Sequence, residues 1–139
     1  MKLITRETDY AVRALCYMAK AKGEVVSVSV LVSELKIPRP FLRKLLQVLH
    51  KKGILNSFKG NGGGFSLGLR PDKIFIAGLI NIFQGPFCLN ECIFKKKLCP
   101  NRGVCILREK ISDIERYVTG QLKAITIASL AKQGRINNA

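Results

Sequence analysis

Four of the five cysteines of this chain lie in the 18-residue stretch CLNECIFKKKLCPNRGVC, from Cys88 to Cys105. Their spacing is C-x3-C-x6-C-x5-C, and three consecutive lysines, Lys95 to Lys97, lie between the second and third thiols. In a reducing compartment, clustered cysteines indicate metal or redox chemistry more often than disulfides. Neighbouring positive charge lowers the pKa of a thiol and so favours the thiolate, the form that binds metal.

Three kinds of chemistry fit this run. An iron–sulfur cluster is held by thiolates on a loop, and Pro100, Asn101 and Gly103 are loop-forming residues. Four cysteines can also close the tetrahedral shell of a structural zinc site. The run has no CxxC pair, however, and its longer gaps are wide for a zinc knuckle. A disulfide-based thiol switch is the third possibility. The spacing counts against zinc; we favour the cluster and keep the thiol switch as the second interpretation.

The remaining candidate metal ligands of soft character are few. Cys16 lies at helical spacing with the apolar residues around it, which predicts a small buried side chain rather than a ligand. The only histidine, His50, falls inside a predicted helix and is not expected to bind metal.

Length and net charge indicate what kind of partner the chain binds. With 139 residues it is long enough for one domain with a real core, and its formal net charge is +15. Charge on that scale indicates a polyanionic partner such as nucleic acid. The opening residues lack the apolar core of a signal peptide, and polar residues and a proline interrupt the apolar stretch 74–89. We therefore expect a cytoplasmic protein without a membrane partner.

The first seventy residues predict helices and then a hairpin. Residues 5–20 have helical periodicity, SVSVLVSELKIP predicts a short helix capped by Ser27 or Ser29, and FLRKLLQVLHKKG predicts a third helix that begins near Pro40. Two helices joined by a short turn form a helix-turn-helix pattern. The two short apolar segments ILNSF and FSLGL, on either side of KGNGGG, predict a β-hairpin, or wing.

Charge, helix pair and wing together predict DNA binding. The first turns of a recognition helix meet base edges, so Arg39 and Arg43 are the first candidates for specificity and Lys44 for affinity. A glycine-rich tip is slim enough to enter a minor groove, where Lys59 and backbone N–H groups would meet phosphate. The complete set of predicted DNA-contacting residues is Arg39, Pro40, Phe41, Arg43, Lys44, Lys59, Gly60 and Asn61.

Over almost its whole length the sequence resembles the IscR/NsrR-type winged-helix regulators, also called the Rrf-two family. The matching stretches are MKLITRETDYAVRAL, IPRPFLRKLLQVLHKKGIL, KGNGGGFSLGLRP, LINIFQGP with the cysteine run, and REKISDIERYVTGQLKAITIASL. This resemblance implies a dimeric transcription regulator, often with an iron–sulfur cluster held by the cysteine loop. No catalytic constellation is present, because GNGGG lacks the Lys-Ser/Thr of a phosphate-binding loop, and we expect no enzymatic activity.

The resemblance assigns the cluster to three cysteines. The family pattern falls on Cys92, Cys99 and Cys105 and leaves two candidates for the fourth ligand. Asp9 matches the place of a carboxylate that some relatives supply from the partner subunit, whereas Cys88 would give an all-cysteine site within one chain. The two-iron and four-iron forms of the cluster remain equally open.

A final apolar stripe predicts the dimer. Leu107, Ile111, Ile114, Val118, Leu122 and Ile125 recur at steps of three and four residues, which suits a long helix packed on another helix. We therefore expect a mostly α fold with a small β-hairpin wing: a winged helix-turn-helix domain (1–86), a cysteine-rich cluster loop (87–105), and a dimerisation helix with a tail (106–139).

The expected function is a DNA-binding regulator, acting as a repressor on a near-palindromic operator, whose affinity an iron–sulfur cluster controls in response to iron, redox state or nitric oxide. One alternative is a cluster-free thiol- or metabolite-sensing regulator of the same fold. The other is a basic iron–sulfur redox or assembly protein whose charge serves an acidic protein partner.

Overall fold

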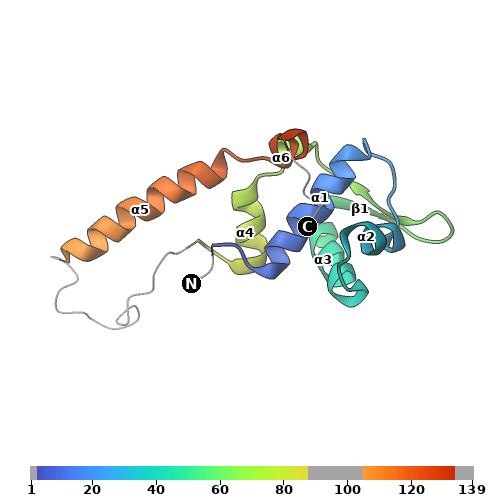
Figure 1. Cartoon of the computed structure of the whole chain (residues 1–139), viewed down its shortest axis with the longest axis horizontal. Coiled ribbons are helices and arrows are strands. Elements are labelled where there is room, and N and C mark those ends of the chain that lie inside the picture. Colours follow the sequence, from blue (N-terminus) through green and yellow to red (C-terminus); the bar gives the residue numbers. More distant parts are fainter. Residues whose placement is uncertain (1–2, 88–104, 134–139) are drawn as a thin grey trace.

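The computed structural model of the chain describes residues 3–87 and 105–133. Three helices, one hairpin and a long helix follow one another in the predicted order, with α4 and α6 as further helices that the sequence did not predict (Figure 1). The elements are α1 (Arg6–Lys20), α2 (Val28–Leu35), α3 (Arg39–Lys51), β1 (Leu55–Phe58), β2 (Gly64–Leu67), the short 3-10 helix η1 (Pro71–Lys73), α4 (Ile76–Gln84), α5 (Ile106–Lys123) and α6 (Ile127–Gln133). This arrangement confirms the mostly helical fold with a β-hairpin wing.

The first helices begin where the sequence supplies caps. The hydroxyl of Thr5 accepts a hydrogen bond from the N–H three residues later at 3.5 Å, and that of Ser27 does the same at 3.2 Å. Each satisfies an N–H group that has no partner inside the helix. α2 ends at Lys36, which has a left-handed φ of 55°. Pro38 and Pro40 then start α3, where a missing N–H removes no helical hydrogen bond.

A single core joins α1 to the other helices of the head, which comprises α1–α4, the hairpin and α6. α1 packs against α2, α3, α4 and α6, so it fixes the position of the recognition helix and of α4 together. Each fully buried aliphatic side chain contributes about 1.5–3 kcal/mol through removal from water. The largest of these side chains are Leu15, Met18, Leu31, Leu42, Leu46, Leu49, Leu55, Leu79, Ile80 and Ile127.

The hairpin is fastened to the segment that precedes α2. β1 and β2 pair antiparallel, with Phe58 opposite Gly64. Val26 then forms an isolated bridge with Phe65, with N–H···O distances of 2.8 and 2.9 Å. Gly64 has a φ of +153°, and a Cβ atom there would lie 2.2 Å from the carbonyl oxygen of Val26. Only glycine fits this close approach, so the position is required for the wing to dock.

Backbone pairing between distant segments ties the C-terminal helices to the head. The N–H of Ile76 donates to the carbonyl of Ile125 at 3.0 Å, and the N–H of Ile127 donates to that of Ile74 at 2.9 Å. The predicted helical stripe included Ile125, but α5 ends at Lys123 and Ile125 lies in this pairing instead. The pairing turns the chain so that α6 can pack on α1.

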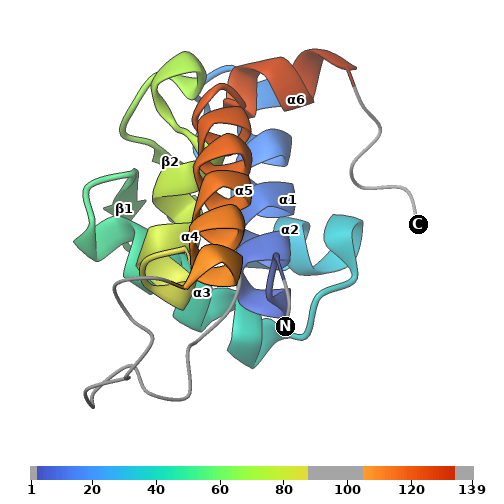
Figure 2. The same ribbon diagram turned by 90° about the vertical axis from the view of Figure 1, so that its left-hand side faces the viewer.

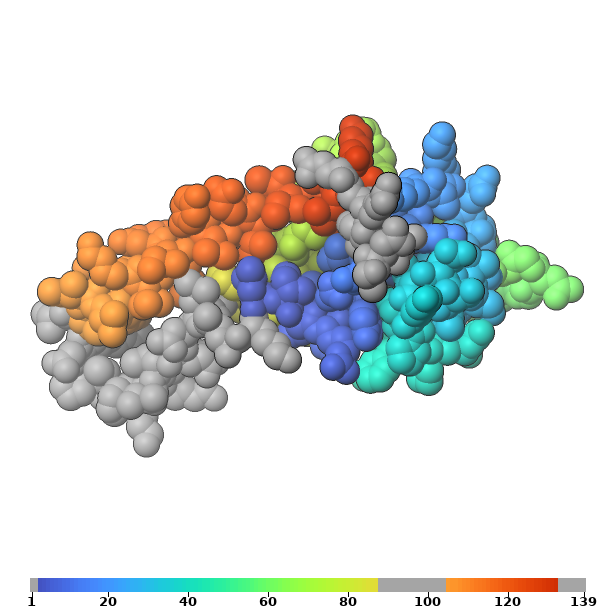
Figure 3. Space-filling view, in the orientation of Figure 1, coloured from blue at the N-terminus to red at the C-terminus, as the bar shows by residue number. Residues whose placement is uncertain are grey.

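α5 leaves the head and projects along the long axis of the molecule (Figures 1 and 3). Its C-terminal part packs on α4, where Leu122 is only 8% exposed. Leu107 and Ile114, in the part that projects, are 70% and 51% exposed. Viewed along the long axis, α5 lies in front of α4 and α1 (Figure 2). The predicted stripe is therefore covered by its own chain at one end only.

None of the helices in the two described ranges is both long enough and apolar enough to cross a bilayer. α5 has 18 residues, but charged side chains such as Arg108, Glu109 and Lys110 cover its other faces.

Candidate nucleic-acid interface and cysteine segment

α3 presents a basic surface on the side that faces away from the core. Its apolar face is buried and consists of Leu42, Leu45, Leu46 and Leu49. The residues predicted to contact DNA from this helix are all exposed and lie together in its first turns: Arg39, Pro40, Phe41, Arg43 and Lys44. Phe41 is 48% exposed and places an aromatic side chain among these basic residues.

The basic side chains of this surface differ in their contacts. The guanidinium of Arg39 donates a hydrogen bond to the hydroxyl of Ser29 on α2 at 3.1 Å, so Arg39 is held toward the first helix of the helix-turn-helix pair. Neither Arg43 nor Lys44 forms an ion pair with any residue in the described ranges. Their charges are available to an anion. Ser29 was considered from the sequence only as a helix cap; its distance of ten residues from Arg39 carries no local signal.

The wing carries the other predicted DNA contacts. Lys59, Gly60 and Asn61 are exposed at its tip, which protrudes at the opposite end of the molecule from the first turn of α5 (Figures 1 and 3). Gly60 has a positive φ of 87°, and a Cβ atom on Gly63 would lie 2.5 Å from the carbonyl oxygen of Phe58. The tight turn therefore requires glycine at these two positions for its own backbone geometry.

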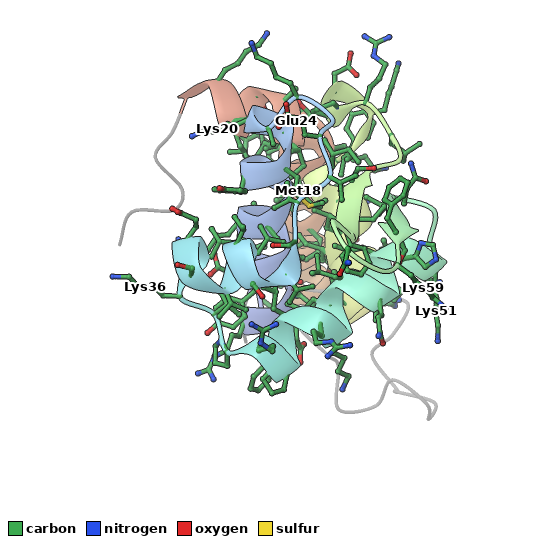
Figure 4. All side chains as sticks on the ribbon, turned by 90° about the vertical axis from the view of Figure 1, so that its right-hand side faces the viewer. Met18, Lys20, Glu24, Lys36, Lys51 and Lys59 are labelled. Carbon is green, nitrogen blue, oxygen red and sulfur yellow. The ribbon has the colours of Figure 1, made fainter. Side chains whose placement is uncertain are left out.

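The end of α3 and the wing form one continuous surface. Nδ1 of His50 lies 3.0 Å from the carbonyl oxygen of Leu55, so the histidine links the last turn of α3 to the start of β1. The carbonyl can only accept, so Nδ1 carries the hydrogen in this contact. Lys51 and Lys59 lie on the same side of the molecule, away from Lys36 (Figure 4). His50 thus links α3 to the wing through a backbone contact.

Cys16 is a core residue, as the helical spacing predicts. It is 1% exposed on α1. Burial raises the pKa of its thiol to about 11, against a smaller lowering by Lys20. The thiol is therefore protonated at neutral pH, and a protonated thiol is neither a metal ligand nor an effective nucleophile.

Of the cysteines in the run, Cys105 lies in the described ranges; Cys88, Cys92 and Cys99 lie outside them. Cys105 is half-buried and forms the N-cap of α5, where its Sγ accepts a hydrogen bond from the N–H of Arg108 at 3.4 Å. A backbone N–H that points at the sulfur also stabilises a thiolate ligand, because hydrogen bonds to sulfur are one of the factors that tune such sites. This position suits a soft metal ligand.

Asp9 lies in the first turn of α1 and is half-buried. Its carboxylate forms an ion pair with Arg13, one turn further on, at 2.9 Å. Glu7, the neighbouring carboxylate, is exposed. Asp9 can bind a metal only if its contact with Arg13 loosens or if one carboxylate oxygen serves each partner.

A single chain keeps these two candidate ligands apart. Cys105 precedes the first turn of α5, and this turn lies at the far end of the long axis from the body of the head, whereas Asp9 lies on α1 (Figure 1). Within the described ranges, no three potential ligands of the His, Cys, Asp or Glu type come together. A site that uses both Asp9 and Cys105 would therefore combine residues from two chains.

An exposed basic recognition helix, a helix packed behind it and a glycine-tipped wing define a winged helix-turn-helix protein. The model of the Rrf2 family, described as iron-dependent transcriptional regulators, matches residues 4–133. The chain belongs to the Rrf2 family of transcriptional regulators.

Individual relatives agree with this assignment. A candidate HTH-type transcriptional regulator of Aquifex aeolicus (strain VF5) is 35% identical over 123 residues, which covers 87% of this chain and 85% of the relative. The HTH-type transcriptional regulator NsrR of Bacillus subtilis (strain 168) is 29% identical over 134 residues, with 95% and 91% covered. The solved structure of CymR, the global cysteine regulator of B. subtilis, has the same fold, with a TM-score of 0.79, 24% identity, and 97% and 100% of the two chains covered.

Proposed function

We propose that this protein is a homodimeric repressor that binds a near-palindromic operator, and that an iron–sulfur cluster on its cysteine run controls its affinity for DNA. The observation that carries the proposal is the pairing of an exposed basic recognition helix with a basic wing tip on one side of a strongly basic domain. Family membership supplies the regulatory role, and the family description supplies the link to iron.

DNA would lie across α3 and the wing. Arg43 and Lys44 have no ion-pair partner in the described ranges, so no ion pair has to break before they contact DNA. Arg43 would contact a guanine edge through a bidentate hydrogen bond, and Lys44 would contact phosphate. Arg39, held by Ser29, is better placed for a phosphate near α2 than for a base edge. The tip residues Lys59, Gly60 and Asn61 would follow the neighbouring minor groove.

The exposed part of α5 supports the dimer. Large apolar side chains that are 51–70% exposed lie along it, and isolated proteins seldom leave so continuous an apolar face in water. A second copy of the same helix would cover it through a two-fold interface. Because the wing lies at the opposite end of the long axis, the two recognition helices would then lie far apart, as two half-sites of one operator require. The side chains concerned are Ile106, Leu107, Ile114 and Tyr117.

The cluster would be held by Cys92, Cys99 and Cys105, with Asp9 of the partner subunit or Cys88 as the fourth ligand. When bound, the cluster supplies an iron centre that oxidants, nitric oxide or iron shortage can alter. Cys105 would bind the cluster from the start of α5, and Asp9 would bind it from α1 of the other chain. Occupied and empty forms would then differ in the spacing of the two recognition helices and in operator affinity.

A cluster-free thiol sensor is the second candidate. The fold is shared with CymR, the global cysteine regulator of B. subtilis, and Cys105, whose thiol is half-buried, follows three further cysteines in the sequence. In that version, oxidation or persulfidation of these thiols replaces cluster loss as the signal.

Anaerobic purification followed by absorbance spectroscopy, with iron and sulfide analysis, separates the two candidates. A coloured protein with equal amounts of iron and sulfide supports the cluster. A colourless protein whose operator affinity changes with thiol oxidation supports the thiol sensor. In both cases, genomic DNA captured by the protein should yield a near-palindromic sequence; capture of DNA without a shared sequence would contradict the proposed operator.

A further inference from the structure

Gln84, the last residue of α4, forms a set of hydrogen bonds with the start of α1. Its Oε1 accepts from the N–H of Thr5 at 2.9 Å and from the hydroxyl of Thr8 at 2.7 Å. Its Nε2 donates to the carbonyl oxygen of Leu3 at 3.2 Å. Because a backbone N–H can only donate and a carbonyl can only accept, these partners fix the orientation of the carboxamide.

The hydrogen bonds of Gln84 involve both threonines at the start of α1. Thr5 is the N-cap of the helix, and its hydroxyl lies 3.3 Å from that of Thr8. Thr8 is 0% exposed, so no water can replace Gln84 as the acceptor of its hydrogen. If the end of α4 moved away, a buried hydroxyl would lose its acceptor, which is unfavourable. The position of α4 and the geometry of the cap are therefore linked.

Gln84 also lies at a junction in the chain. It ends the helix that leads into the cysteine run, and Gly85 follows it with a positive φ of 80°. The end of α4 and the start of α1 lie side by side (Figure 1). α1 packs directly on α3, and the turn that Gln84 fastens carries Asp9. One side chain thus connects the segment before the cysteines, a candidate metal ligand and the helix behind the recognition helix.

We propose that Gln84 is the positioning residue that transmits the state of the cysteine segment to the DNA-binding helix, through Thr5 and Thr8 of α1. The inference rests on the proposed function, because it assumes that occupied and empty forms bind DNA differently. A change in the cysteine segment that pulls on α4 shifts the first turn of α1 only while the carboxamide joins them. Without the carboxamide, α3 would have the same position in the occupied and the empty protein.

The test is the ratio of operator dissociation constants of the reconstituted and metal-stripped proteins. Allosteric couplings correspond to a ratio of about 5–150. We expect such a ratio in the wild type and a ratio near one in Gln84→Met, which keeps the shape of the side chain without its polar atoms. Asn81→Met is the matched control, because Asn81 is an exposed carboxamide one turn earlier on α4. It should keep the wild-type ratio.

A ratio preserved in Gln84→Met, even with a lower Tm, would mean that the contact only stabilises the fold and would overturn the inference. Thr8→Val removes the hydrogen bond to Gln84 and the hydroxyl contact with Thr5 but leaves Gln84 in place, and it decides the matter if Gln84→Met fails to fold or to hold a cofactor. A collapsed ratio supports the inference, and a preserved one overturns it. A wild-type ratio of one would refute the proposed sensing itself and the transmission with it. That result is distinct from a wild-type ratio that survives the substitutions.

Discussion

Substituting Cys105 by serine and by alanine separates its role as a helix cap from its predicted role as a metal ligand. Its Sγ accepts the N–H of Arg108 at 3.4 Å at the start of the 18-residue α5. Serine is a preferred N-cap residue and alanine has no acceptor, so the metal-stripped Cys105→Ala protein should be less stable than Cys105→Ser by about 1 kcal/mol. For a domain of this size, that difference corresponds to about 3–5 °C in Tm.

Both variants should lose the visible absorbance of the cluster after anaerobic reconstitution, because a serine hydroxyl is a hard ligand that does not replace a thiolate. Calorimetry of the stripped proteins measures the cap, and absorbance with iron and sulfide analysis measures the ligand. A Cys105→Ser protein with the wild-type spectrum would exclude Cys105 as a ligand. Equal Tm values for the two variants would refute the reasoning about the cap.

Arg43→Ala should weaken operator binding by about 1–3 kcal/mol and reduce discrimination at one base pair. Lys59→Ala should weaken binding to all sequences and lower by about one unit the slope of log affinity against log salt concentration. Anisotropy titration measures both. Ile114→Asp puts a charge on the exposed stripe of α5 and should give a folded monomer in analytical ultracentrifugation, because this side chain is 51% exposed. Gly64→Ala should lower the free energy of unfolding by about 1–3 kcal/mol in urea titrations, because its φ of +153° strains any other residue. Asp9→Ala should change the cluster spectrum if Asp9 is the fourth ligand, and a mixed dimer with one altered chain should keep one normal site.

Controls and contrary outcomes follow from the same surfaces. Operator affinity unchanged in both DNA-contact variants would contradict the docking. Arg116→Asp places a carboxylate on an exposed position of α5 outside the stripe, with a larger change of charge than Ile114→Asp and the loss of the ion pair with Asp113, and should remain dimeric. A dimeric Ile114→Asp protein would exclude the stripe as the interface. Gly78→Ala is the control for Gly64, because a Cβ atom on Gly78 meets nothing within 4 Å. If Asp9→Ala leaves the spectrum intact while Cys88→Ala changes it, the fourth ligand is the cysteine.

The fold was predictable where the signals are local. The prolines around Arg39 and the glycine-rich tip mark a helix start and a turn within a few residues, and the cap of α2 is Ser27, one of the two serines predicted for it. α4 was not identified: its buried residues Ile76, Leu79 and Ile80 do have helical spacing, but the apolar side chains on its other positions hide that period. The end of α5 was placed two residues late, since Ile125 continues the spacing but pairs with the backbone of Ile76.

Contacts between distant residues had no signal in the sequence. Gln84 lies 76 residues from Thr8, and a single glutamine at the end of a helix has many possible partners. The exposure of Arg43 followed from the helical period, but that of Phe41 did not, because Phe41 lies one turn before the buried Leu45. The contact of Arg39 with Ser29 had no signal either, because it depends on the angle between two helices. The wing glycines were predicted for their slimness, whereas Gly64 is required by the approach of Val26.

The backbone pairing of residues 74–76 with 125–127 closes the head independently of the chain that connects α4 to α5. Hydrogen bonds of 3.0 and 2.9 Å join the two paired segments, whatever the length of the chain that connects α4 to α5. Closing a loop of twice the length costs only about 0.6 kcal/mol more. Insertions, deletions and new ligand sets in that connection therefore change the stability of the head little. One winged helix-turn-helix head can be combined with many different sensors.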